Sequence, residues 1–142
     1  MSYERLIHEH DRIDRALARL QRLSEMAEPD ISMTSETLSE LATELTDHLA
    51  REDGTIYPRM IESRVGEVSS IARRFIAEFD AIAADWKRYL DEWMPDRMGA
   101  DWDRFRRETD AMIARLTARI HAENTVLYSA ALNHGLIALR AR

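Results

Sequence analysis

The sequence predicts an all-α protein that folds as an antiparallel, up-down-up-down four-helix bundle. Only four glycines and three prolines interrupt its 142 residues, and alanine, leucine, glutamate and arginine, all strong helix formers, are abundant. Apolar residues recur at alternating steps of three and four over long segments, which is the spacing of one helix face. Long helices joined by short connectors are typical of a bundle, and no segment shows the alternation of a strand.

The first two helices occupy the N-terminal half of the chain. The first is expected from about Ser2 to Met26, and Pro29 ends it because proline lacks the N–H that a helix needs. Its core-facing residues are Leu6, His10, Ile13, Leu17, Leu20 and Leu23 or Ser24. We expect Pro58 to kink or fray the end of the second helix. The caps expected for that helix are Ser32, Thr34 and Ser35, and its core-facing residues are Leu38, Leu41, Leu45, His48, Glu52 and Ile56.

The other two helices lie beyond Gly66. The third is expected to end at Met94-Pro95, and a short linker should run from Asp96 to Ala100. Its core-facing residues are Val68, Ala72, Phe75, Phe79, Ile82, Trp86, Leu90 and Trp93. The fourth helix should begin near Asp101 and end at Asn133-His134-Gly135, a C-cap signal. Its core-facing residues are Trp102, Phe105, Met112, Leu116, Glu123, Leu127 and Ala130. The last residues, ending at Arg140-Ala141-Arg142, are expected to fray or to dock on the bundle.

Composition excludes several classes of protein. Residues 1–142 are expected to form one domain, without an obvious internal repeat or a low-complexity segment. The net charge of -6 argues against nucleic-acid binding, because phosphates require a basic surface. The absence of cysteine excludes thiolate metal sites and cysteine nucleophiles. No apolar run is long enough to span a membrane or typical of a signal peptide, so we expect a cytoplasmic protein without a membrane partner.

Four polar residues interrupt the apolar stripes. His10 lies on the stripe of the first helix, and His48 and Glu52 lie one turn apart on that of the second. Glu123 lies on the stripe of the fourth helix, with Arg119 on its flank. Burying a carboxylate is costly unless it is paired or bound to a metal. Two imidazoles and two carboxylates are therefore expected to converge in the core, with an arginine beside them.

Each of these residues also has an ordinary structural explanation. A lone buried histidine is more often hydrogen-bonded than bound to metal, and a lone buried glutamate is usually salt-bridged. Four such residues on three helices nevertheless favour a metal site, because bundle cores build iron sites from carboxylates and imidazoles. Imidazole suits iron, zinc and copper, and the lack of thiolate argues against a soft metal.

Three segments carry a family resemblance. His48-Leu-Ala-Arg-Glu52-Asp53-Gly-Thr-Ile56-Tyr57-Pro58 resembles the pattern His-x-x-x-Glu-Glu-x-x-Leu-Phe-Pro. Glu9-His10-Asp11-Arg-Ile13 resembles Glu-His-Asp-x-Ile, and Glu123-Asn-Thr-Val-Leu-Tyr128 resembles Glu-Asn-x-x-Leu-Phe. These patterns are those of the hemerythrin family, specifically the bacterial HHE cation-binding domains. The resemblance covers nearly the whole chain and implies the same four-helix bundle, with His10, His48, Glu52 and Glu123 as metal ligands and iron as the cofactor.

The sequence departs from the family pattern on its third and fourth helices. The family normally holds two irons with histidines from all four helices and two bridging carboxylates. Phe79 and Phe75 stand where the third helix would supply histidines, and Arg119 stands where the fourth would supply one. His121 is near in sequence but faces away, unless a π-bulge rotates it inward.

The resemblance implies that one half of the family's site is retained. We predict a mononuclear site for iron or another divalent metal, in which Arg119 replaces the second metal by pairing with both carboxylates. Phe75 and Phe79 would fill the space left by imidazoles. Such a site would serve the sensing or handling of iron, dioxygen or nitric oxide, with a small diatomic ligand as a further partner. The alternative is a metal-free structural or protein-interaction module, in which Arg119 neutralises both carboxylates without a metal.

No motif identifies an enzyme, because the chain has no nucleophilic triad and no glycine-rich phosphate loop. Tyr57 and Tyr128 are candidates for the mouth of a pocket or for packing at a helix end. Asp14 is placed to support His10 or to face solvent. Surface positions are expected for His8, His121 and His134, and packing positions for Trp86, Trp93 and Trp102. Metal identity, oligomeric state and physiological signal stay open.

Overall fold

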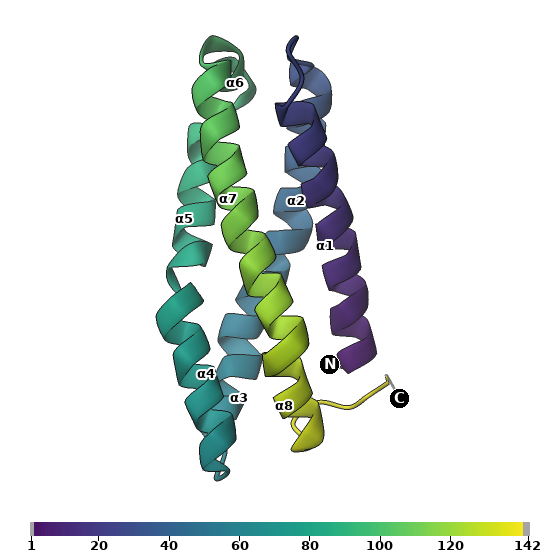
Figure 1. Ribbon diagram of the computed structural model, residues 1–142, viewed down its shortest axis with the longest axis vertical. Coiled ribbons are helices and arrows are strands. Elements are labelled where there is room, and N and C mark those ends of the chain that lie inside the picture. Colours follow the sequence, from purple (N-terminus) through teal and green to yellow (C-terminus); the bar gives the residue numbers. More distant parts are fainter. Residues whose placement is uncertain (1, 141–142) are drawn as a thin grey trace.

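Four helical arms make up most of the computed structural model, which describes residues 2–140 (Figure 1). The arms are α1 (Tyr3–Ser24); α2 (Ile31–Arg51), the π-helix η1 (Glu52–Ile56) and α3 (Tyr57–Ile61); α4 (Gly66–Phe79) and α5 (Ala81–Glu92); and α7 (Trp102–Ala122), the π-helix η2 (Glu123–Leu127) and α8 (Tyr128–Asn133). Successive arms run in opposite directions along the long axis. The predicted all-α, up-down-up-down bundle is therefore confirmed.

Side-chain caps mark where α1 and α2 begin. Ser2 caps α1 by accepting a hydrogen bond from the Arg5 N–H. Asp30 caps α2 by accepting one from the Met33 N–H at 3.0 Å. The expected caps Ser32, Thr34 and Ser35 were wrong, because all three lie inside α2. The aspartate directly after Pro29 provides the earlier cap.

The second arm stays helical past its proline. We expected Pro58 to kink or fray the helix, but α3 continues to Ile61. Pro58 falls in the first turn after η1, where a missing N–H is tolerated because no α-helical hydrogen bond is lost. The widened turn of the π-helix therefore accommodates the proline.

The third arm is divided, and its connector is helical. α4 and α5 meet at Asp80, although the core-facing stripe predicted through both is buried apart from a half-buried Leu90. The predicted linker from Asp96 to Ala100 was wrong, because Pro95–Ala100 forms the short helix α6. Proline at the first helical position has a preset backbone angle, which favours this helix.

The segment after the fourth arm forms hydrogen bonds with the start of α1. The fourth arm ends at Asn133 as predicted, and Gly135 follows with a φ of 72°, a conformation that favours glycine. The carbonyls of Ala138 and Leu139 accept the N–H groups of Tyr3 and Glu4, at 2.7 and 3.1 Å. The expectation for the tail is confirmed at these residues, whereas Ala141 and Arg142 lie outside the described part.

Apolar side chains from all four arms form one continuous core along the bundle. Within residues 2–140, none of the helices combines the length and the apolar character that crossing a bilayer requires. A group of polar side chains lies inside this core, about where the two π-helices occur.

Candidate metal centre

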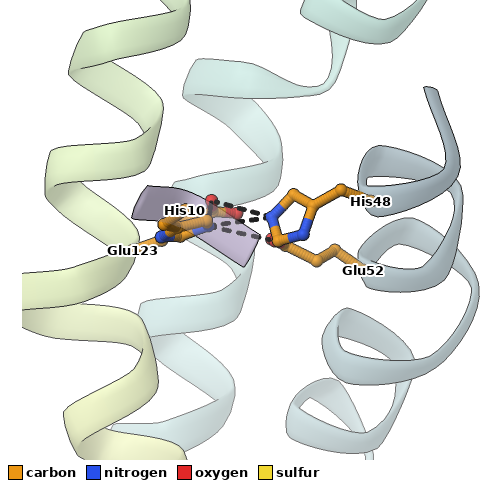
Figure 2. A group of neighbouring side chains, drawn as sticks. All are labelled: His10, His48, Glu52 and Glu123. Carbon is orange, nitrogen blue, oxygen red and sulfur yellow. Dashed lines mark hydrogen bonds and ion pairs between the residues drawn. The ribbon is translucent and has the colours of Figure 1, made fainter. Parts of the chain in front are cut away.

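Four of the predicted site residues meet in the core of the bundle. His10 comes from α1, His48 from α2, Glu52 from η1 and Glu123 from η2, and none is more than 1% exposed (Figure 2). One potential ligand atom from each lies within 4.8 Å of the others. The four residues form a buried group that can bind a metal.

The spacing of these atoms matches the shell of a single ion. His10 Nε2 lies 2.8 Å from His48 Nε2, 3.2 Å from Glu123 Oε1 and 3.7 Å from Glu52 Oε1. His48 Nε2 is 3.8 Å from Glu123 Oε1 and contacts Glu52 Oε1 directly. Metal–ligand bonds of roughly 2.0–2.2 Å place neighbouring donors roughly 2.8–3.6 Å apart. The separations of 2.8 and 3.2 Å fall in this range, and those of 3.7 and 3.8 Å lie just beyond it, so the residues present are spaced for one bound ion.

Both imidazoles are oriented by a second residue. The Asn124 Oδ1 accepts from His10 Nδ1 at 2.6 Å, and the Glu9 carboxylate accepts from His48 Nδ1 at 3.0 Å. When the two rings are neutral, these bonds place the proton on Nδ1 and leave the lone pair on Nε2. Two Nε2 lone pairs then face each other at 2.8 Å, which is unfavourable unless a proton or a metal ion lies between them. A hydrogen-bond acceptor at Nδ1 is also the usual support of a histidine that binds metal through Nε2.

Two carboxylate oxygens of the site have no hydrogen-bond donor. They are Glu52 Oε2 and Glu123 Oε1, and both residues are fully buried. An unpaired buried carboxylate oxygen is costly, and a bound cation would compensate this cost. Glu123 Oε1 faces the imidazoles and agrees with them in indicating a place for a cation, whereas Glu52 Oε2 faces Arg119.

The charges of the cluster alter the acidity of its members. Burial would raise the pKa of Glu52, but the neighbouring His10 and His48 imidazoles and the charges of His48 and Arg119 lower it to about 2. Burial would lower the pKa of His48, but its bonds to Glu52 and Glu9 and their charges raise it. In the metal-free protein a proton on His48 thus helps to balance the carboxylates, and a metal ion would take its place.

Each π-helix begins at a carboxylate of the site and aims a tyrosine at it. The N–H of Tyr57 bonds the Glu52 carbonyl, and the N–H of Tyr128 bonds the Glu123 carbonyl. In a π-helix the hydrogen bond spans five residues instead of four, so residues five apart become neighbours on one face. Each tyrosine therefore lies on the same face as the glutamate five residues before it.

The two tyrosines bond across the bundle. The Tyr57 hydroxyl donates to Glu123 Oε2 at 3.1 Å, and the Tyr128 hydroxyl donates to Glu52 Oε1 at 2.6 Å. Of the two positions expected for these tyrosines, a pocket mouth or packing at a helix end, the pocket mouth was wrong, because they are 3% and 0% exposed. The π-helices, which the sequence did not predict at these positions, turn them inward. Burial raises the pKa of both hydroxyls, and the charge of Glu52 adds to this effect.

Arg119 lies on the opposite side of the carboxylates from the imidazoles. Its Nε is 3.3 Å from Glu123 Oε2, and its Nη2 is 3.8 Å from Glu52 Oε2. Nη2 also donates to Asp53 at 3.2 Å, and Nη1 to the Phe79 carbonyl at 3.4 Å. At 1% exposure the guanidinium is buried. Arg119 thus pairs with both glutamates, as we predicted.

The third arm has phenylalanines at the two positions where the family pattern has histidines. Phe75 and Phe79 are 7% and 6% exposed, and their ring centroids are 5.5 Å apart. Neither offers a ligand atom. The half of the core between α4 and α7 therefore contains an arginine and two apolar rings, and its residues do not fit a second metal ion.

The other histidines lie at the surface, as predicted. His8, His121 and His134 are exposed, and so is Asp14. The π-helix of the fourth arm begins at Glu123, which is beyond His121, so it does not rotate His121 inward. The role considered for Asp14 is filled by Asn124, which holds His10.

Three supporting residues were not predicted from the sequence. They are Glu9, Asp53 and Asn124, and each is the direct chain neighbour of a predicted ligand. An acidic or amide residue beside each ligand was the signal that could have revealed them. A second missed feature is a repeat: His48, Glu52 and Tyr57 stand four and five residues apart, and Arg119, Glu123 and Tyr128 repeat this spacing.

Comparison with known protein families agrees with this geometry. The model of the hemerythrin HHE cation-binding domain matches residues 1–131 of the 142-residue chain. The chain belongs to the hemerythrin HHE family. No curated protein and no solved structure matches it. Within the described part of this hemerythrin domain, His10, His48, Glu52 and Glu123 form a buried group that could hold a metal ion.

Proposed function

We propose that this hemerythrin domain binds one iron ion through His10, His48, Glu52 and Glu123, and uses it to sense or handle iron, dioxygen or nitric oxide. The observation that carries the proposal is the facing pair of imidazole Nε2 atoms at 2.8 Å, each fixed by a partner on its Nδ1. Nitrogen and carboxylate donors without thiolate suit iron, and bundle cores commonly hold it.

The stoichiometry of one ion follows from the placement of Arg119. Each glutamate directs one oxygen toward the imidazoles and the other toward the guanidinium. A second cation would have to occupy the space of a buried positive charge, which electrostatic repulsion opposes. Arg119 supplies the neutralisation that a second metal would otherwise provide.

The chemistry follows from the ligand count. Four protein donors leave coordination positions free on an octahedral ion, and iron bound there would supply redox change and affinity for a small diatomic ligand. The protein's own residues orient the imidazoles through Glu9 and Asn124 and exclude water by burial. These features favour a sensor or handling role over reversible dioxygen carriage, which in this family uses two irons.

A metal-free module is the second candidate, and the Arg119 network favours it. The guanidinium already pairs with Glu52, Glu123 and Asp53, and a buried ionic cluster with several hydrogen bonds can persist without a metal. The domain would then serve as a structural or interaction module.

Elemental analysis separates the two candidates. Protein purified without chelator should contain one iron per chain, and added iron should raise its melting temperature. His48→Ala should lose both effects, whereas His121→Ala, which changes an exposed histidine, should keep them. Two irons per chain would contradict the mononuclear site. A protein free of metal and indifferent to iron, zinc and manganese would support the metal-free module.

A further inference from the structure

We infer that Tyr128 is a fifth ligand of the metal and binds it through the phenolic oxygen. This inference rests on the proposed function and extends its ligand set to two nitrogens and three oxygens. Four observations support it. They are the position of the hydroxyl oxygen, its contact with a His10 lone pair that no proton satisfies, the π-helix and packing that hold the ring in place, and the contrast with Tyr57.

The hydroxyl oxygen of Tyr128 lies inside the group of ligand atoms. It is 2.6 Å from Glu52 Oε1, 3.0 Å from His10 Nε2 and 3.4 Å from His48 Nε2. These separations fall close to the range of roughly 2.8–3.6 Å expected between donors around one ion. The oxygen therefore occupies the place of a donor atom.

The Tyr128 hydroxyl cannot satisfy its contacts to both Glu52 and His10 by hydrogen bonding. A tyrosine hydroxyl has one proton, and the short contact to Glu52 uses it. His10 donates from Nδ1 to Asn124, so a neutral His10 has only a lone pair at Nε2. The Tyr128 oxygen and His10 Nε2 then present lone pairs to each other at 3.0 Å. A cation that accepts both lone pairs removes this repulsion.

The backbone and the packing hold Tyr128 in this place. The π-helix η2 puts it on the face of Glu123, and its ring stacks on His10 with centroids 5.1 Å apart and planes at 26°. The residue is 0% exposed. Because the ring cannot swing toward solvent without breaking the core, the oxygen is preorganised toward the site.

Tyr57 shows what a tyrosine does outside the ligand group. It follows its own glutamate at the same spacing, but its hydroxyl donates to Glu123 Oε2 on the side of Arg119. Its ring lies against the guanidinium, with 5.4 Å between the ring centroid and Cζ. Tyr57 is therefore assigned a hydrogen-bonding role and provides a matched control.

Coordination by Tyr128 forms an oxygen–metal bond and breaks the O–H bond. The proton is released to solvent, and no electron is transferred. Tyrosine oxygen is an established iron ligand in proteins. A phenolate bound to ferric iron gives a visible charge-transfer band, and excitation in that band enhances the ring modes of the bound tyrosine in resonance Raman spectra.

The test uses the full-length protein loaded with ferric iron, with the iron content measured on the same samples. We expect a visible band and tyrosinate Raman modes in the wild type and in Tyr57→Phe, and loss of both in Tyr128→Phe. Deuteration of tyrosine rings in the wild type should shift the Raman modes, which assigns them to tyrosine even if Tyr128→Phe binds iron poorly.

Three outcomes would overturn the inference. Stoichiometric iron without the band would show that Tyr128 only donates a hydrogen bond to Glu52, and would leave the proposed function standing. A band that survives in Tyr128→Phe or disappears in Tyr57→Phe would assign the ligand elsewhere. Absence of bound iron in the wild type would remove the proposed function together with the inference.

Discussion

The two halves of the bundle core share the carboxylates of Glu52 and Glu123 but surround them with different side chains. Between α1 and α2, Glu52 and Glu123 meet two imidazoles that are held by Asn124 and Glu9. Between α4 and α7, the same glutamates meet the guanidinium of Arg119. One half has facing lone pairs that a proton or a bound metal ion can separate, whereas the other half contains a positively charged side chain. Buried carboxylates therefore require positive charge but not necessarily a metal.

The second and fourth arms resemble each other in backbone where they reach the site. Each has a glutamate at the start of a π-helix and a tyrosine five residues later. The residue after each glutamate supports a group on another arm, since Asn124 bonds His10 and Asp53 bonds Arg119. The same backbone arrangement therefore supports an imidazole in one half of the core and a guanidinium in the other.

The largest expected effect comes from placing histidines in the half of the core that contains Arg119. The double variant Phe79→His, Arg119→His removes the buried charge and supplies two imidazoles beside both carboxylates. We expect the iron content to rise from one ion to two per chain, measured by elemental analysis. Phe79→His alone keeps Arg119 and should stay at one ion. If the double variant also stays at one, the two halves differ by more than these side chains.

Removing Arg119 alone should destabilise the metal-free protein strongly. Arg119→Met leaves two buried carboxylates without their partner, and breaking a buried pair typically costs about 3–5 kcal/mol. Urea unfolding in the presence of a chelator measures this loss. Arg115→Met on the same helix is the control, because its pair with Asp85 at 2.8 Å is partly exposed and should contribute at most about 1 kcal/mol. Equal losses for the two variants would contradict the structural role of Arg119.

Weakening the hydrogen bond that supports His48 should reduce metal affinity, whereas weakening the one that supports Arg119 should not. Glu9→Gln removes the charge that orients His48, and such changes typically cost about 10–100-fold in metal affinity. Asp53→Asn alters the corresponding support of Arg119 and should leave the affinity nearly unchanged. Competition with a chromophoric chelator measures both. A larger loss for Asp53→Asn would reverse the assignment of the halves.

The smallest effect concerns acid stability without metal. The pKa of Glu52 is about 2 in the folded protein, against an ordinary value of 4.5. The unfolded chain therefore binds more protons between these values, so the free energy of unfolding should fall as the pH is lowered through this range. Chelator-treated protein unfolded by urea at several pH values tests this. Glu52→Gln should show a shallower slope, and an equal slope would mean that Glu52 is not stabilised by its partners.

The sequence predicted the bundle and the residues that meet in its core. The stripes that passed through His10, His48, Glu52 and Glu123 were sufficient, because helical periodicity decides which side chains face inward. The inward position of Arg119 followed from the same geometry.

The sequence did not predict the features that depend on local hydrogen bonding. The π-helices turned Tyr57 and Tyr128 inward, and a straight α-helix would place them elsewhere. Partners such as Glu9 and Asn124 lie at the edge of the apolar stripes, where periodicity does not separate a supporting residue from an exposed one. Asp30 caps α2 ahead of three residues that are also good caps, and composition alone does not rank them.

Anomalous diffraction from crystals of the iron-loaded protein tests the contrast between the halves most directly. We expect one iron peak per chain, bonded to His10, His48, Glu52 and Glu123, with the Arg119 guanidinium on the far side of both carboxylates. A second peak beside Arg119, or an iron-loaded crystal without a peak at the histidines, would contradict it.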